Sequence, residues 1–318
     1  NSPEFSLEAA LVLAANGIKT YLFDGMRPTP ELSYSVRELG AVGGIVVTAS
    51  HNPPEYNGYK VYWADGGQVV PEQARDIIAE IEEIDDFSIV KTMDEGEALE
   101  EGLLKYVGEE LDEKYLDTLV NALPDTDLAK KNGEDITIVY TPLHGTGSTA
   151  VPQLLKRLGF SNLHVVEEQA DGDSDFSTVE SPNPEDRSAF AMALDLAEEV
   201  DADLVMATDP DSDRMAPVVK TADGSYKALN GNETGVLFAD YLLSTAKEAG
   251  ELPDNAVIVK SIVSTEMVRE VANEYGAEVM DVLTGFKFVG EKITEFEKTG
   301  EKEFILGFEE SLGYLIGK

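Results

Sequence analysis

Three aspartates alternate in the sequence TDPDSDR, at Asp209, Asp211 and Asp213, directly after the apolar stretch ADLVMA. In a loop that leaves a strand, this spacing lets three carboxylates face one point. Such charges repel one another unless a divalent cation lies between them, and hard oxygen ligands favour Mg²⁺ or Ca²⁺. A calcium EF-hand is excluded because Arg214 stands at its glycine position and Lys220 at its glutamate position. The segment therefore predicts a cation site with positions open for a phosphate oxygen, and the alternative is a solvated acidic turn.

A second polar loop, TASHNP, follows the apolar stretch GGIVV and contains Ser50 beside His51. The tight G-x-S-x-G elbow of many serine hydrolases is absent, since Ala49 and His51 flank the serine, and adjacent residues rarely form a good Ser-His dyad. A capping hydroxyl and a phosphorylated serine remain as interpretations. The aspartate loop favours phosphorylation, because a phosphoserine would complete the cation's shell. Its charge of roughly −1.5 to −2 requires cations nearby, and those available are His51, Lys60 and Arg214.

A third loop, GFEESLGY, carries Glu309 and Ser311 on a turn between glycines, a combination that suits sugar hydroxyls. The segment TGFK contains Thr284 and Lys287, and the lysine could meet a phosphate. A further candidate is TPLHGTG, which contains His144 in a glycine-containing connection between a strand and a helix. Taken singly, the last two segments are more typical of structure than of catalysis.

Three segments of the chain share one predicted order of secondary-structure elements, and these elements would position the three polar loops. Each has an apolar-periodic helix, a glycine at the helix C-cap (Gly17, Gly159 or Gly276) and a short strand. A later strand in each then ends in one polar loop. In two copies a strand also precedes the helix, and in the first copy we expect it upstream of residue 1. Ligands of open α/β sheets gather at the carboxyl ends of strands. We therefore predict three tandem homologous α/β domains, with mixed sheets flanked by helices and one shared cleft; the alternative is three ordinary connections.

The composition is that of a globular protein with two or three domains: 318 residues, of which 42% are hydrophobic. Asp plus Glu outnumber Lys plus Arg by 62 to 24, and the formal charge of −38 opposes binding to nucleic acid or to an anionic membrane surface. The absence of cysteine excludes disulfides and is consistent with a reducing cytoplasm. No apolar run reaches the ~18 residues of a membrane span. We expect a cytoplasmic protein without nucleic-acid or membrane partners.

Polar, turn-rich segments predict two domain boundaries. NALPDTDLAKKNGED indicates a linker near residue 128, and KTADGSYKALNGNE indicates a boundary near residue 229. The predicted domains are 1–128 with the serine loop, 129–229 with the aspartate loop and 230–318 with the glutamate loop. Because the chain has no initiator methionine and opens close to a helix start, we expect a fragment whose first domain lacks its N-terminal part. Truncation of the third domain at its C-terminal end is left as an alternative.

In this order and at these separations, the loops resemble the α-D-phosphohexomutase superfamily, and most closely its phosphoglucomutase branch. TASHNP resembles the family's phosphoserine loop, DPDSDR its metal-binding loop and FEESLG its sugar-binding loop, usually written G-E-E-S-x-G. NGYK, SPNPE and TGFK also resemble family segments. The resemblance covers essentially the whole chain, and it implies a four-domain enzyme whose first three domains share an α/β fold.

The resemblance also implies an intramolecular phosphotransferase, in which phospho-Ser50 exchanges a phosphoryl group with a hexose monophosphate through a bisphosphate. Arg214 and His51 would assist the phosphoryl group, and Lys60 would act as general acid or base. The implied ligands of one Mg²⁺ are a Ser50 oxygen and the carboxylates of Asp209, Asp211 and Asp213. The implied substrate-binding residues are Thr284, Lys287, Glu309 and Ser311.

Glucose 1,6-bisphosphate is the implied activator, and the expected assembly is a monomer or a weak dimer. The family's fourth domain and the start of its first domain are not found in this sequence. SLGY stands where phosphomannomutase-type enzymes have a histidine after the sugar loop. This favours the interconversion of glucose 1-phosphate and glucose 6-phosphate. A phosphomannomutase, a phosphopentomutase and a non-catalytic protein that binds sugar phosphate or metal stay open as alternatives.

Overall fold

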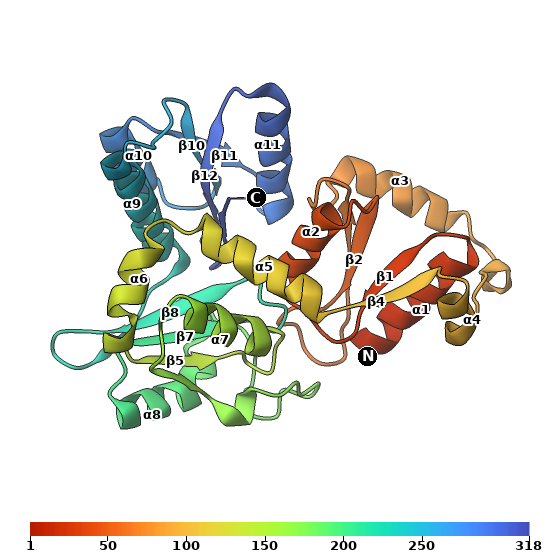
Figure 1. Cartoon of the computed structure of the whole chain (residues 1–318), viewed down its shortest axis with the longest axis horizontal. Coiled ribbons are helices and arrows are strands. Elements are labelled where there is room, and N and C mark those ends of the chain that lie inside the picture. The colour runs from red at the N-terminus through yellow and green to blue at the C-terminus, as the bar shows by residue number, and fades with distance from the viewer. Residues whose placement is uncertain (318) are drawn as a thin grey trace. The chain divides into compact units, whose positions relative to one another are not determined.

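The computed structural model describes residues 1–317 and contains two compact units (Figure 1). The first unit comprises residues 1–49 and 55–115, and the second comprises residues 50–54 and those from 116 onward. Helix α5 (Glu109–Ala122) continues from the first unit into the second. The short segment 50–54 belongs to the second unit although strands of the first unit flank it in the sequence. No helix in the described part of the chain is long and apolar enough to cross a membrane.

The strands of the first unit form two separate pairs. β1 (Thr20–Phe23) runs parallel to β4 (Leu104–Val107), and β2 (Gly43–Val47) runs antiparallel to β3 (Tyr59–Trp63). The helices of this unit are α1 (Ser2–Ala15), α2 (Thr29–Glu38), α3 (Pro71–Glu82) and α4 (Glu95–Glu100), with a 3₁₀ turn at Phe87–Ile89. Gly17 follows α1 with a φ of +75°, a left-handed conformation that suits glycine and ends the helix before β1.

A five-stranded mixed sheet begins the second unit, with the strand order β6-β5-β7-β8-β9. β5 (Ile138–Thr141) is buried throughout and pairs in parallel with β6 (Leu163–Val165) and β7 (Leu204–Thr208). β8 (Met215–Lys220) and β9 (Tyr226–Ala228) extend the sheet by antiparallel pairing. Helix α8 (Ala191–Val200) packs its alanines on one face, and α7 (Gly147–Arg157) lies on the opposite side (Figure 1). The 3₁₀ turns here are Glu167–Gln169 and Arg187–Phe190.

A four-stranded mixed sheet follows, with the order β11-β10-β12-β13. β10 (Ala256–Ser261) is parallel to β11 (Glu278–Val282) and β12 (Glu303–Phe308), while β13 (Tyr314–Ile316) is antiparallel to β12. Side chains alternate along β10, so it contributes to cores on both faces. Ile258 packs with α9 (Gly231–Ala249) and α10 (Met267–Tyr275), and Val257 and Val259 pack with α11 (Phe286–Thr299). Figure 1 shows these helices on the two sides of the sheet.

The two sheets of the second unit share one strand order, which confirms the repeated plan read from the sequence. A helix, a glycine with positive φ and a strand recur at Gly159 (φ +94°) and Gly276 (φ +79°). The orders β6-β5-β7-β8 and β11-β10-β12-β13 then match position by position. In the first unit β1 and β2 follow one another along the chain as the corresponding strands of the two sheets do. Among residues 1–115, however, β1 pairs with β4 and β2 pairs with β3, in two separate sheets. The predicted class, tandem α/β domains with mixed sheets flanked by helices, is confirmed.

The segment expected as a linker near residue 128 is largely helical. α6 spans Thr126–Asn132, with the Asp125 side chain accepting a hydrogen bond from the Leu128 amide, and a 3₁₀ turn follows at Gly133–Asp135. A Cβ on Gly133 would lie 2.6 Å from the carbonyl oxygen of Gly159. The segment is therefore packed against its neighbours instead of forming an open linker. The domain limits at 128 and 229 stay predictions.

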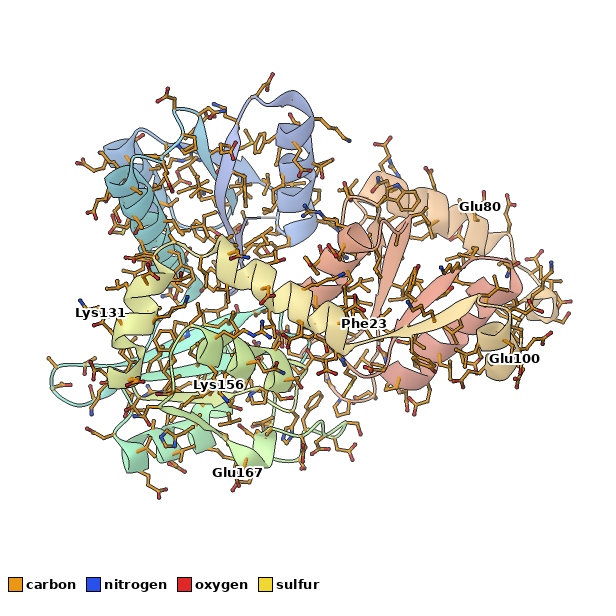
Figure 2. The ribbon with its side chains drawn as sticks, viewed as in Figure 1. Phe23, Glu80, Glu100, Lys131, Lys156 and Glu167 are labelled. Atoms are coloured by element: carbon orange, nitrogen blue, oxygen red, sulfur yellow. The ribbon has the colours of Figure 1, made fainter. Side chains whose placement is uncertain are left out.

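Carboxylates dominate the surface of both units. With 62 acidic and 24 basic residues, 38 carboxylates would remain unneutralised even if every lysine and arginine paired with one. The side chains of Glu80, Glu100 and Glu167 are exposed and extend away from the ribbon in Figure 2. Repulsion among such charges opposes the compact state.

Added salt should therefore stabilise the folded chain. The screening length falls from about 30 Å at 0.01 M salt to about 3 Å at 1 M, which weakens repulsion between exposed carboxylates. We expect the unfolding temperature, followed by circular dichroism, to rise steadily with KCl over this range. A triple variant with Glu80→Gln, Glu100→Gln and Glu167→Gln should depend less on salt. An unfolding temperature that stays constant or falls would contradict this electrostatic account.

One carboxyl of the first unit is buried on α2. The Glu31 side chain is 1% exposed, and burial, followed by its contact with Asp112, raises its pKa to about 8. Arg27 contacts Asp112 with two nitrogens, Nε to Oδ1 and Nη2 to Oδ2, each at 2.8 Å. The guanidinium is thereby committed to Asp112, and the Glu31 carboxyl favours its protonated form.

This carboxyl predicts a loss of stability at alkaline pH. The folded-state pKa of about 8 lies above the ordinary value of 4.5. The protonated Glu31 carboxyl therefore contributes fully to the free energy of unfolding below pH 4.5, and this contribution is lost as the pH rises through 8. Glu31→Gln keeps a donor for Asp112 without a charge. It should raise the free energy of unfolding at pH 9 by about 1–3 kcal/mol, with solvent screening allowed for, and change it little at pH 4.

Urea unfolding of both proteins at the two pH values measures the difference. The exposed substitution Glu80→Gln is the control, and it should leave the wild-type pH dependence in place. Equal pH dependence in Glu31→Gln and wild type would show that Glu31 is not the titrating group.

Candidate functional site

The aspartate loop joins β7 to β8 and is held by its own backbone. The Arg214 amide donates to Asp209 Oδ1 at 3.1 Å, and the Ser212 amide donates to the Asp209 carbonyl at 3.0 Å. Ser212 has a φ of +55°, which tightens the turn. As a result, one carboxylate oxygen from each of Asp209, Asp211 and Asp213 lies within 4.8 Å of the others.

The three carboxylates form a concentrated and largely buried charge. Asp209 and Asp211 are 0% and 4% exposed, and Asp213 is half-buried. Burial, followed by the neighbouring Asp211 and Asp213 charges, raises the pKa of Asp209 well above its ordinary value. A divalent cation would offset both the repulsion and the desolvation. Three hard oxygen donors on one short loop fit Mg²⁺.

Ser50 lies directly against this loop. Its Oγ donates to Asp209 Oδ2 at 2.6 Å, and His51 Nδ1 is 3.1 Å from the same Oγ. The expectation that adjacent serine and histidine side chains meet poorly is wrong here, because Ser50 has a φ of +52° and this left-handed conformation brings the two side chains together. Since the hydroxyl proton goes to Asp209, the bond with His51 requires a proton on Nδ1. Burial, followed by the charge of Arg214, lowers the pKa of His51.

The side chain of Arg214, the last residue of the aspartate loop, lies between Asp213 and Glu185 of the segment SPNPE. Its Nη1 is 3.8 Å from Glu185 Oε2, and its Nε is 3.8 Å from Asp213 Oδ1. These separations are longer than good hydrogen bonds, so the guanidinium is attracted to both carboxylates without being locked to either. It can therefore turn toward an anionic ligand.

The glutamate loop lies between β12 and β13 and is bonded to the start of β8. The Met215 amide donates to the Leu312 carbonyl at 3.1 Å. Glu309 is 8% exposed, and its Oε1 accepts a hydrogen bond of 2.5 Å from the Gly285 amide. Burial raises the pKa of Glu309. Gly285 itself has a φ of +113°, a backbone conformation that residues other than glycine rarely adopt.

The remaining candidates fall into two groups. Ser311 is on the same turn as Glu309. Thr284 precedes Gly285, whose amide donates to Glu309, and Lys287 is two residues after Gly285. Lys60 is on β3, opposite Val46 of β2, in the first unit. Its role in proton transfer stays a prediction. The residues that the second unit brings together are Ser50, His51, Asp209, Asp211, Asp213, Arg214 and Glu309.

Family comparison matches the whole arrangement of domains. Models described as phosphoglucomutase/phosphomannomutase, alpha/beta/alpha domains I, II and III, match residues 1–87, 113–224 and 230–318 respectively. The chain belongs to the phosphoglucomutase/phosphomannomutase family. The three polar loops fall one in each matched domain, as the resemblance of their sequences predicts.

Individual members of the phosphoglucomutase/phosphomannomutase family agree with this assignment. Phosphoglucomutases of Staphylococcus saprophyticus and Staphylococcus haemolyticus are each 38% identical over 314 residues, with 99% of this chain and 55% of the relative aligned. The chain thus spans about half the length of the curated relatives it matches. A solved structure of a putative phosphomannomutase from Thermus thermophilus aligns with a TM-score of 0.71 at 27% identity, covering 96% of this chain and 61% of that one.

The fold is also shared with a more distant mutase. The structure of Aspergillus fumigatus N-acetylphosphoglucosamine mutase in complex with GlcNAc-6P and magnesium aligns with a TM-score of 0.56 at 16% identity, covering 96% of this chain and 70% of that one. At this identity the likeness concerns the fold alone.

The loop TPLHGTG supports the aspartate loop, a role that the sequence did not reveal. The Thr146 amide and Oγ1 both donate to the carbonyl of Pro210, at 2.8 and 3.1 Å. A Cβ on Gly145 would lie 2.4 Å from Pro210 Cα, so the two backbones are in direct contact. The closely spaced Gly145 and Gly147 were the available signal, since glycine permits such an approach.

The same loop has unusual backbone geometry before its glycines. Leu143 and His144 are consecutive left-handed residues, with φ values of +47° and +63°. Such residues cost free energy and persist only where their surroundings fix them. The His144 ring supplies that restraint, because Nδ1 contacts the Asp171 carbonyl at 3.0 Å and Nε2 contacts Thr178 Oγ1 at 2.7 Å. His144 is therefore a structural residue of the site's support.

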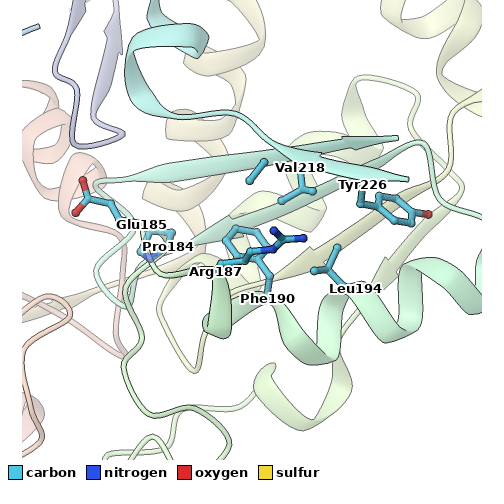
Figure 3. Close-up of a pocket in the computed structure, with 8 residues that line it drawn as sticks. Pro184, Glu185, Arg187, Phe190, Leu194, Val218 and Tyr226 are labelled. Carbon is cyan, nitrogen blue, oxygen red and sulfur yellow. The ribbon is translucent and has the colours of Figure 1, made fainter. Parts of the chain in front are cut away.

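A small pocket of about 50 Å³ adjoins the segment SPNPE, whose Pro184 and Glu185 are in its lining. It lies between α8 and the strands β8 and β9 (Figure 3). A hexose phosphate needs far more space, since ligand pockets usually measure roughly 300–1,000 Å³. Its lining residues are Pro184, Glu185, Arg187, Phe190, Leu194, Val218, Tyr226 and Ala228.

Gly145→Ala should displace the aspartate loop. The added Cβ would meet Pro210 Cα and, at 2.6 Å, the Pro210 carbonyl oxygen, and backbone atoms cannot rotate away. We expect a loss of about 1–3 kcal/mol in the free energy of unfolding. Amides of residues 209–214 should exchange hydrogen faster, as measured by mass spectrometry. Thr149→Ala, at an exposed position of α7, is the control. Wild-type exchange at 209–214 in Gly145→Ala would show that TPLHGTG does not support the loop.

Proposed function

We propose that the protein is a phosphoglucomutase, which interconverts glucose 1-phosphate and glucose 6-phosphate through phospho-Ser50 and a glucose 1,6-bisphosphate intermediate. The proposal rests chiefly on the 2.6 Å hydrogen bond between Ser50 Oγ and Asp209 Oδ2. That contact sets a hydroxyl beside a carboxylate cluster suited to Mg²⁺. Curated phosphoglucomutases with 38% identity across the three domains support the same activity.

The aspartate cluster supplies the metal site in this proposal. Asp209, Asp211 and Asp213 would hold one Mg²⁺, with an oxygen of phospho-Ser50 as a further ligand. When bound, the cation neutralises charge on the phosphoryl group during transfer. The magnesium in the Aspergillus fumigatus complex, a protein of the same fold, is consistent with this metal.

The other loops would bind and orient the phosphate and the sugar. Arg214 and His51 would contact oxygens of the transferring phosphoryl group. The buried Glu309 carboxylate and the Ser311 hydroxyl would bind sugar hydroxyls, and Lys60 would carry the proton of the reacting hydroxyl. The proposed contacts to the remainder of the substrate are Thr284 and Lys287.

The proposal extends to the protein's partners and setting. A hexose phosphate is the substrate, glucose 1,6-bisphosphate the activator, and the protein acts in the cytoplasm as a monomer or weak dimer. The charge of −38 supports the absence of nucleic-acid and anionic membrane partners, because such a charge repels both.

Phosphorylation of Ser50 tests the proposal. Full-length protein incubated with glucose 1,6-bisphosphate and MgCl₂ should gain the mass of one phosphoryl group, lost again on phosphatase treatment. Ser50→Ala should not gain this mass, although its free energy of unfolding should fall by at most ~1 kcal/mol, the usual effect of losing a capping hydroxyl. Asp211→Asn should gain it more slowly, since one metal ligand is weakened. A Ser50 that stays unmodified under every priming condition would rule out the mutase mechanism.

Turnover on three sugar phosphates then defines the substrate. The full-length enzyme should convert glucose 1-phosphate faster than mannose 1-phosphate or ribose 1-phosphate. A clear preference for mannose or ribose would instead indicate a phosphomannomutase or a phosphopentomutase. Binding of sugar phosphate and Mn²⁺ without phosphorylation would indicate a binding protein.

A further inference from the structure

Two buried serines at the end of β10 face the glutamate loop. Ser261 is 0% exposed and Ser264 is 4% exposed, and their Oγ atoms lie 2.7 Å apart. Glu310 Oε2 accepts from both hydroxyls, at 2.8 Å from Ser261 and 3.1 Å from Ser264. The Glu310 amide in turn donates to Ser264 Oγ at 3.0 Å. Glu310 is therefore attached to this serine pair, Ser261 and Ser264, through both its side chain and its backbone.

A fully buried lysine fixes the backbone of the serine pair. Lys260 Nζ donates to the carbonyl of Ser264 at 3.1 Å and is 3.4 Å from the carbonyl of Ser261. It also lies 2.9 Å from carboxylate oxygens of Glu266 and Asp281. A buried ammonium is costly unless its donors are satisfied, so these partners hold the turn after β10 in one conformation. The serine pair is thus positioned by contacts that do not involve Glu310.

The opposite side of the turn has no spare room. A Cβ on Gly231, at the start of α9, would lie 2.2 Å from the Glu310 carbonyl oxygen and 2.8 Å from the Leu312 amide nitrogen. Leu312 has a φ of +68°, and the Glu309 amide closes the turn by donating to the Gly313 carbonyl at 3.0 Å. The turn is therefore held between α9 and the serine pair.

The two adjacent glutamates of the turn have different partners. Glu309 contacts the Gly285 amide, while Glu310 contacts the serine pair. The proposed function uses Glu309 and Ser311, which lie on either side of Glu310 in the sequence. Whatever fixes Glu310 therefore also restricts the two residues that would bind the sugar.

We infer that Glu310 is a positioning residue of the glutamate loop, whose carboxylate, bound by Ser261 and Ser264, holds Glu309 and Ser311 in a substrate-binding conformation. The catalytic consequence rests on the proposed function, but the attachment of the loop does not. Removing the carboxylate would leave at least one of the two buried hydroxyls without an acceptor, since only one of them can donate to the other, and an unsatisfied buried group costs about 1–3 kcal/mol. Because the serines need an acceptor oxygen, Gln at this position should substitute in part.

Hydrogen exchange of the chain tests the attachment without reference to activity. Amides of residues 309–313 should exchange at least about tenfold faster in Glu310→Ala than in wild type, and the increase should be smaller in Glu310→Gln. Ser264→Ala should give an intermediate increase. Glu303→Ala removes an exposed carboxylate from the start of β12, the strand that leads into the turn, and is the matched control, with wild-type exchange expected. Unchanged protection of 309–313 in Glu310→Ala would overturn the inference.

Kinetics of the full-length enzyme test the consequence for substrate binding. Misplacement of a binding loop typically costs on the order of 10- to 100-fold, and we expect Glu310→Ala to raise KM for glucose 1-phosphate by that factor. Glu310→Gln should restore most of the loss. Ser261→Ala combined with Glu310→Ala should be no worse than Glu310→Ala alone, because both changes remove one interaction.

The outcomes separate the two proposals. Independent, additive effects of the serine and glutamate substitutions would mean that Glu310 acts directly on the substrate, which would overturn the positioning role. Faster exchange at 309–313 in a protein without mutase turnover would reject the proposed function and support the attachment. If Glu310→Ala does not fold, exchange in Ser264→Ala decides the question.

Discussion

Repulsion among the carboxylates of Asp209, Asp211 and Asp213 is the constraint on which the second unit depends. Three acidic groups within 4.8 Å of one another, largely removed from water, would separate if their loop were free to move. Backbone hydrogen bonds within the loop and the contact of TPLHGTG with Pro210 oppose that separation. The protein thus maintains an electrostatically unfavourable arrangement by rigid packing, which is expected of a site that a cation and a phosphate complete.

The support for this arrangement comes from two buried strands, β5 and β10. Every residue of β5 and of β10 is buried, and each strand is paired on both sides. The segments at their carboxyl ends, TPLHGTG after β5 and the turn with the serine pair after β10, contact the aspartate loop and the glutamate loop respectively. The hydrogen bond from Met215 to Leu312 then joins the aspartate loop's strand to the glutamate loop, so the two sheets present their polar loops as one body.

The sequence was sufficient for the repeated plan and for the identity of the polar loops. Apolar periodicity and the glycines at 17, 159 and 276 are local signals, and each element they predict is present. The aspartate spacing was equally local. Long-range features were not predictable in this way. The contact of Ser50 with His51 depends on the left-handed backbone of Ser50, and the helix α6, none of whose residues is buried, forms where a linker was expected.

Glu310 shows why composition of a loop underdetermines its function. In FEESLG two glutamates are adjacent and chemically equal, and nothing local distinguishes the one beside Gly285 from the one beside Ser261 and Ser264. Only the fold, which brings the end of β10 to the turn, separates them.

The shared strand order of the two sheets has a consequence for how such proteins diversify. In the two sheets the polar loop follows β7 or β12, the strands that pair with β5 and β10, and in the first unit the serine loop follows β2. A loop at a fixed place in a repeated scaffold can exchange its side chains while the buried core that supports it stays unchanged. Duplicated copies can therefore acquire separate chemical roles without any copy having to evolve a new fold.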